Sequence, residues 1–71
     1  MNIDKYIKAI ERLLKNYENN HTSATNTYTA ICGVLTVATL DNDIMNDDFH
    51  MLLDKRSEFF REHADHINLG L

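Results

Sequence analysis

The residues from Thr22 to Leu40 carry no charged side chain, and six of them are threonines. Because this segment lies in the middle of a chain of 71 residues, its conformation decides the fold. Threonine, isoleucine and valine favour a strand by propensity, but neither set of alternating residues is consistently apolar. At a helical period, apolar side chains gather on one side and small side chains on the other, and the segment is too long for one ordinary strand. We therefore predict a helix over residues 23–40, with Thr22 or Ser23 as its N-cap.

Two further segments repeat apolar residues at a helical period. In residues 3–19 the apolar face consists of Ile3, Tyr6, Ile7, Ile10, Leu13, Leu14 and Tyr17. In residues 47–67 it consists of Phe49, Leu52, Leu53, Phe59, Phe60, Ala64 and Ile67. Asn2 is the expected N-cap of the first helix, and residues 46–48 offer an N-cap and first-turn acids to the third. Asn42 is expected to adopt the left-handed conformation that ends the second helix.

These segments predict an all-α fold, a single domain over residues 1–71 in the form of a small three-helix bundle. Helices joined by short connections pack as antiparallel neighbours. A core of this size is marginal, and small domains are commonly completed by a disulfide, a metal or a second chain. The single cysteine, Cys32, excludes a disulfide within the chain. We therefore expect homodimerisation to complete the bundle; a helical assembly that forms only with a second chain is the rival fold.

One face of the 23–40 helix presents small side chains, through which two backbones can approach closely. A symmetric dimer buries the same patch on both subunits. Gly33 costs about 1 kcal/mol relative to alanine inside a helix, and a close contact would explain its presence. An exposed face that binds nothing is the alternative. The predicted dimer interface comprises Thr25, Thr29, Cys32, Gly33 and Thr36.

Acidic residues align along the outer face of the 47–67 helix. Asp54–Glu58 and Glu58–Glu62 are like-charge pairs at the i,i+4 spacing, each unfavourable by about 0.2–0.5 kcal/mol. The stability of the helix therefore does not explain why these acids are aligned, whereas binding to a basic partner would explain it. The plainer interpretation is a helix face that is simply solvated. The predicted partner-binding residues, called the acidic stripe below, are Asp47, Met51, Asp54, Glu58, Glu62 and Asp65.

Lysine and arginine form a second stripe, on the outer face of the 3–19 helix. Such a stripe can contact phosphates, but no aromatic residue interleaves with it, and the net charge of −4 opposes general nucleic-acid binding. A solvated face is the simpler interpretation. The residues of this basic stripe, the alternative nucleic-acid contact, are Lys5, Lys8, Arg12 and Lys15.

No motif for catalysis, a metal or a cofactor stands out. His63 and His66 have a spacing that can present two metal ligands on one helical turn, yet a tight site needs more ligands, and His63 is more simply a packed imidazole. Cys32 has no charged neighbour in the sequence to activate it. We expect no enzyme, no bound metal and no cofactor. The polar first half of the uncharged segment argues against a transmembrane helix, and the lone cysteine suits a reducing cytoplasm.

The sequence thus favours a non-enzymatic protein that regulates or inhibits a macromolecular partner. Acidic side chains aimed at a basic partner suggest competition for a nucleic-acid-binding surface. Small acidic helical proteins are common among regulators and inhibitors encoded by phages and mobile elements, and this association also favours a regulator or inhibitor. The alternatives are a nucleic-acid-binding regulator that uses the basic stripe, and a structural subunit of a larger assembly. The expected partners are a second copy of the chain and an unidentified protein, and no membrane.

Overall fold

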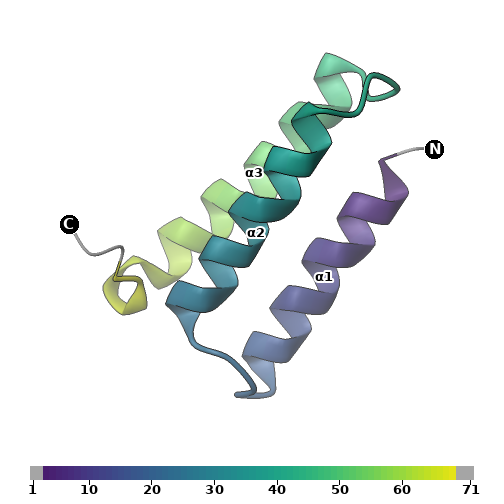
Figure 1. Cartoon of the computed structure of the whole chain (residues 1–71). Coiled ribbons are helices and arrows are strands. Elements are labelled where there is room, and N and C mark those ends of the chain that lie inside the picture. The colour runs from purple at the N-terminus through teal and green to yellow at the C-terminus, as the bar shows by residue number, and fades with distance from the viewer. Residues whose placement is uncertain (1–2, 69–71) are drawn as a thin grey trace.

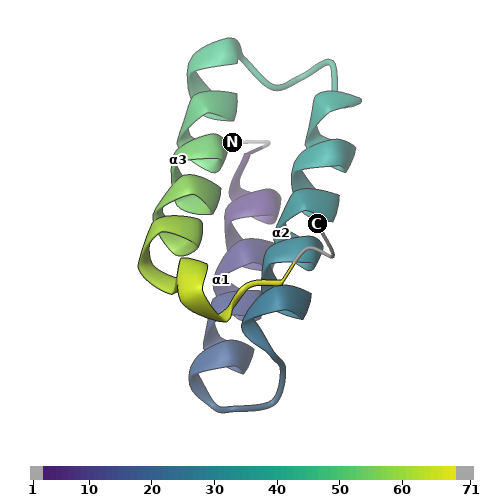
Figure 2. The same ribbon diagram turned by 90° about the vertical axis from the view of Figure 1, so that its left-hand side faces the viewer.

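The computed structural model describes residues 3–68, which form three α-helices and one short 3₁₀ helix. These elements are α1 (Asp4–Glu18), α2 (Ala24–Thr39), α3 (Asn46–His63) and the 3₁₀ helix η1 (Ala64–His66). Consecutive α-helices run in opposite directions, so that α1 and α3 point the same way (Figure 1). The described residues contain no strand, and the three helices pack against one another (Figure 2). The prediction of an all-helical fold is confirmed.

Three of the five threonines of α2 bond their hydroxyls to the backbone of the preceding turn. They donate to carbonyl oxygens three or four residues earlier, in the pairs Thr27–Ser23 (2.8 Å), Thr36–Cys32 (3.0 Å) and Thr39–Thr36 (2.6 Å). Threonine can make this bond while the backbone stays helical. Thr27 is therefore buried, at 1% exposure, without an unpaired hydroxyl. The strand propensity of threonine is overridden because α2 packs against both other helices, and the buried Thr27 leaves no polar group unpaired there.

The ends of the helices follow the sequence predictions only in part. Ser23 caps α2 as expected, since its side chain accepts a hydrogen bond from the N–H of Asn26 at 3.1 Å. Met45 precedes α3 without a side-chain cap, so the polar residues 46–48 start that helix without capping it. Asn2, the expected cap of the first helix, lies outside the described residues.

The left-handed residue of the described chain is Asn20, with φ of 62°, and not Asn42. Asn20 ends α1: its N–H donates to Tyr17 at 3.0 Å and the following N–H of His21 donates to Asn16 at 2.9 Å. This pair of bonds is the Schellman arrangement that closes a helix with a left-handed residue. Asn42 has no such role, because the turn after α2 is held by the Asp41 carboxylate, which accepts the N–H of Asp43 at 2.9 Å.

The third helix is shorter than the expected range of 47–67. The backbone leaves the helical conformation at His63, and η1 turns the chain toward the start of α2. There the N–H of Asn68 donates to Thr25 Oγ1 at 2.8 Å, and Ile67 packs against the core. As a result Ala64, which was expected on the apolar face, is exposed.

The core is small and draws on all three helices. Ile10 of α1, Ile31 of α2 and Leu52 of α3 have no exposed surface. The rest of the buried apolar cluster consists of Ile3, Tyr6, Ala24, Leu35, Ala38 and Phe59. Phe60, which was expected in the core, is 39% exposed, with its ring tilted against that of Tyr28.

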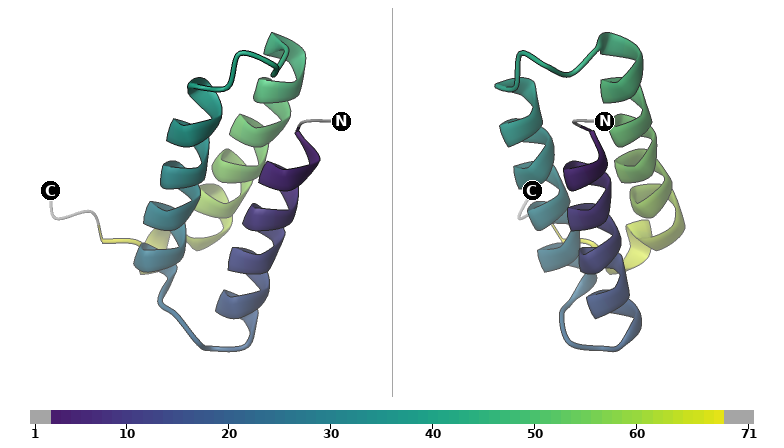
Figure 3. Two further views of the ribbon diagram at one scale, coloured as in Figure 1. Left: turned by 45° about the vertical axis from the view of Figure 1, so that its right-hand side comes forward. Right: turned by 90° about the vertical axis from the view of Figure 1, so that its right-hand side faces the viewer.

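Both outer helices pack on α2, and the backbones of α1 and α3 approach each other less closely (Figure 3). Two side-chain contacts tie α1 to the rest of the molecule at its ends. Near its start, the Tyr6 hydroxyl donates to Asp41 Oδ2 at 2.7 Å. Near its end, the rings of Tyr17 and Phe59 meet edge to face with centroids 5.3 Å apart. Of these two contacts, the first joins α1 to the link between α2 and α3, and the second joins α1 directly to α3.

The replacement Gly33→Ala tests whether the glycine of α2 has a role within the chain. A Cβ at this position meets no atom within 4 Å, so alanine should raise the free energy of unfolding by about 0.5–1 kcal/mol through its higher helix propensity. Urea unfolding followed by circular dichroism measures the change. At a protein concentration low enough for the chain to be monomeric, a loss of stability would contradict the prediction. A loss that appears only at higher concentration would indicate a close contact made by a second chain.

Candidate functional site

The acidic stripe lies on the solvent side of the third helix. All six of its residues are exposed. Within residues 3–68, no lysine or arginine forms an ion pair with the stripe, and the Nε2 atom of His63 lies 3.8 Å from the Glu62 carboxylate. Asp65 is an exception to the expected alignment, because it belongs to η1 and not to α3. The stripe is therefore a continuous row along α3 with one member displaced beyond its end.

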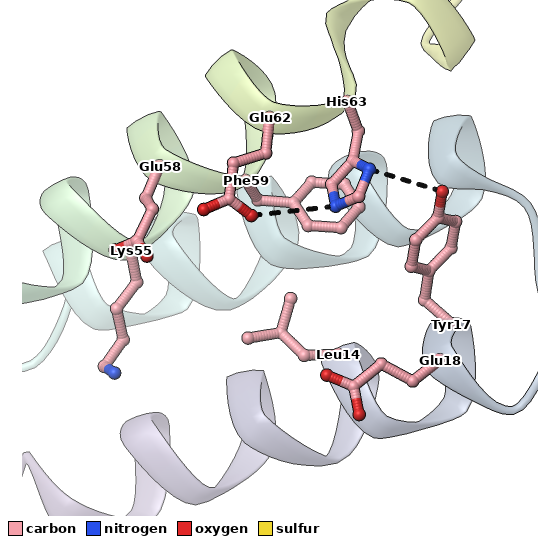
Figure 4. Close-up of a pocket in the computed structure, with 8 residues that line it drawn as sticks. All are labelled: Leu14, Tyr17, Glu18, Lys55, Glu58, Phe59, Glu62 and His63. Atoms are coloured by element: carbon pink, nitrogen blue, oxygen red, sulfur yellow. Dashed lines mark hydrogen bonds and ion pairs between the residues drawn. The ribbon is translucent and has the colours of Figure 1, made fainter.

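A groove of about 380 Å³ lies between α1 and α3. Leu14, Tyr17 and Phe59 form its apolar part, and three carboxylates, Lys55 and His63 complete its lining (Figure 4). The carboxylates belong to Glu18 of α1 and to Glu58 and Glu62 of α3. The acidic stripe therefore forms one edge of this groove, and Glu18 adds an acid on the opposite side. Sequence reasoning missed Glu18, because no periodicity shows which residues of two different helices face each other.

His63 is held in an aromatic cluster at one end of this groove. Its ring lies 4.9 Å from that of Tyr17 and 4.6 Å from that of Phe59, measured between centroids. Its Nδ1 is 3.4 Å from the Tyr17 hydroxyl. These contacts agree with the interpretation of His63 as a packed imidazole. His66 is exposed, and the described residues contain no group of three side chains suited to bind a metal.

The small-residue face of α2 is divided by the structure. Thr25 is used within the chain, because its Oγ1 accepts the Asn68 N–H and donates to the His66 carbonyl at 3.4 Å. Thr29, Gly33 and Thr36 are exposed, and Cys32 is half-buried. Val37 and Leu40, at 57% and 78% exposure, continue this uncharged surface toward the end of α2. Most of the predicted dimer interface is thus accessible in the single chain.

The basic stripe is exposed along α1, but one of its members is engaged elsewhere. Lys5 Nζ lies 3.5 Å from Asp41 Oδ2 and 5.1 Å from the centre of the Tyr6 ring. Lys8, Arg12 and Lys15 form no ion pair with any residue from 3 to 68. Three free cations therefore remain on this face.

Asp41 joins the start of α1 to the link between α2 and α3. Its carboxylate accepts the N–H of Asp43 and the hydroxyl of Tyr6, and it faces the Lys5 ammonium. These interactions, led by the Asp43 N–H, lower the pKa of Asp41 below its usual value. The same bond to Asp41, together with burial, raises the pKa of Tyr6. One feature of the sequence points to this contact: a tyrosine on an apolar face needs a partner for its hydroxyl.

Comparison with known proteins finds no matching family model, no matching curated protein and no matching solved structure. Among the described residues, no helix combines the length and apolar character needed to cross a bilayer.

The Asp41 contact predicts a loss of stability in acid. Because the pKa of Asp41 is lower in the folded chain than in the unfolded one, its contribution is complete above about pH 5 and is lost as the pH falls below about 4. Urea midpoints measured between about pH 6 and pH 3 should fall in the wild type and fall less in Asp41→Asn.

Asp43→Asn is the matched control for this measurement. It removes an exposed carboxylate two residues away but keeps the N–H that Asp41 accepts. Its acid dependence should therefore follow that of the wild type. Equal flattening of the pH dependence in both variants would contradict the role given to Asp41.

Proposed function

We propose that this protein is a non-enzymatic regulator or inhibitor that uses its acidic stripe to occupy the basic, nucleic-acid-binding surface of a protein partner. The observation that carries the proposal is the exposure of Asp47, Asp54 and Glu58 without a lysine or arginine partner within residues 3–68. A row of free carboxylates on a rigid helix matches the charge of a surface built to bind phosphates.

The energetics of the stripe support the same conclusion. Asp54, Glu58 and Glu62 follow one another at the i,i+4 spacing, where like charges repel by about 0.2–0.5 kcal/mol per pair. Cations of a partner that approach this face remove the repulsion and add attraction. The arrangement therefore costs stability in the free chain and contributes affinity in a complex.

Reversal of two stripe charges tests the proposal. Wild-type protein immobilised on resin should retain a basic protein from nuclease-treated lysate, and added DNA or RNA should displace it. The double variant Asp54→Lys/Glu58→Lys should lower the affinity for that protein at least about tenfold, because it replaces attraction by repulsion.

The double variant Glu11→Lys/Asp43→Lys is the matched control, since it changes the net charge equally at exposed sites outside the stripe. It should bind the partner as the wild type does. Equal binding by the stripe variant would remove the proposed function.

Nucleic-acid binding by the basic stripe is the second candidate, favoured by the exposed and unpaired Lys8, Arg12 and Lys15. It predicts the opposite result. Lys8→Glu/Arg12→Glu should abolish binding to nucleic acid and leave the capture of a basic protein intact. The engagement of Lys5 with Asp41 and the net charge of −4 make this candidate the weaker one.

Self-association through the small-residue face of α2 is part of the proposal. Light scattering should give twice the mass of one chain, 8.2 kDa, at about micromolar concentration. Thr29→Arg and Gly33→Leu should shift the protein toward monomer, because each places a bulky side chain on the accessible face of α2. The wild type remaining monomeric at all concentrations would contradict it.

A further inference from the structure

The groove between α1 and α3 combines an apolar floor with acidic edges. Leu14 and Tyr17 are half-buried and line it together with the ring of Phe59. Carboxylates stand on both sides: Glu18 projects from α1, and Glu58 and Glu62 project from α3 (Figure 4). Lys55 is the one lysine or arginine of the lining. A ligand that fits this groove has apolar side chains in the middle and positive charges along its flanks.

The shape of the groove favours a helix as that ligand. It runs between two helices that point the same way and that both pack on α2. A third helix laid into the space between two others repeats the packing by which bundles grow. An amphipathic helix presents its apolar anchors at positions i, i+3, i+4 and i+7 and leaves its flanks for charged residues. The acids on both sides then meet lysines or arginines on both flanks.

We propose that the groove between α1 and α3 binds a basic amphipathic helix of the partner protein, with its apolar side chains against Leu14 and Tyr17 and its cations beside Glu18, Glu58 and Glu62. This inference rests on the proposed function, because the acidic stripe supplies one edge of the groove. It adds that recognition depends on the placement of apolar residues and not on charge alone.

A synthetic peptide of about 15 residues is the probe, with leucines at the i, i+3, i+4, i+7 spacing and lysines elsewhere. A second peptide of the same composition has its leucines distributed around the helix. NMR of the labelled protein follows the Leu14 methyl groups and the Tyr17 ring, and the fluorescence of a labelled peptide gives the dissociation constant. The amphipathic peptide should shift both sets of signals and bind more tightly than the rearranged one.

Glu18→Lys and Glu11→Lys form a matched pair of variants on α1. Both residues are exposed and lie seven positions apart on the same side of the helix, but only Glu18 lines the groove. Glu18→Lys should weaken the binding of the amphipathic peptide about fivefold, and Glu11→Lys should leave it within about twofold.

Three results would overturn the inference: no shift of the Leu14 and Tyr17 signals, equal affinity for the two peptides, or equal effects of the two variants. Shifts of the same signals when the protein alone is concentrated would assign the groove to a second copy and would also overturn it. The proposed function is tested separately, through Asp54, which lies outside the groove lining. If partner capture still depends on Asp47→Lys/Asp54→Lys, both of which are exposed and lie outside the lining, the function stands without the groove.

Discussion

The burial of one side of α2 against both other helices is the interaction on which this fold depends. This burial overrides the strand propensity of the threonines, valines and isoleucines of α2, and three of its threonine hydroxyls bond carbonyl oxygens of the preceding turn. Since α1 and α3 both pack on α2, a change in this one element would remove the surface that positions the other two. The buried Thr27 adds no unsatisfied group to the core, because its hydroxyl is paired with Ser23.

The helices and most of their buried faces could be predicted because spacing alone determines which residues share a side. Ile10 and Leu52 were both placed on apolar faces from the sequence, and both are fully buried. Thr27 was not, because its burial depends on a local bond and not on hydropathy. The end of α3 was missed because η1 is stabilised by a contact distant in sequence, between Asn68 and Thr25.

The candidate site was predictable to a different degree on its two sides. Helical periodicity correctly placed Asp54 and Glu58 on an exposed face, because both belong to one helix. It gave no information on Glu18 or on the groove, since the position of α1 relative to α3 is set by packing on α2 and by contacts between distant residues such as Tyr17 and Phe59. The contacts of Asp41 join residues of different elements, and the periodicity of one helix cannot predict them.

The common direction of α1 and α3 has an electrostatic consequence. The carboxyl-terminal ends of both helices lie at the same end of the molecule (Figure 1), and each carries about half a negative charge from its aligned peptide dipoles. The amino-terminal end of α2 lies at the same end of the molecule and carries about half a positive charge, which offsets only one of these two negative ends. Lys15 and Arg61 lie in the last turns of α1 and α3, but it is Glu18 and Glu62 of those turns that line the groove, so side-chain and backbone charge have the same sign on the groove side. Over a screening distance of about 8–10 Å, this pole can orient an approaching cation before any side chain touches it.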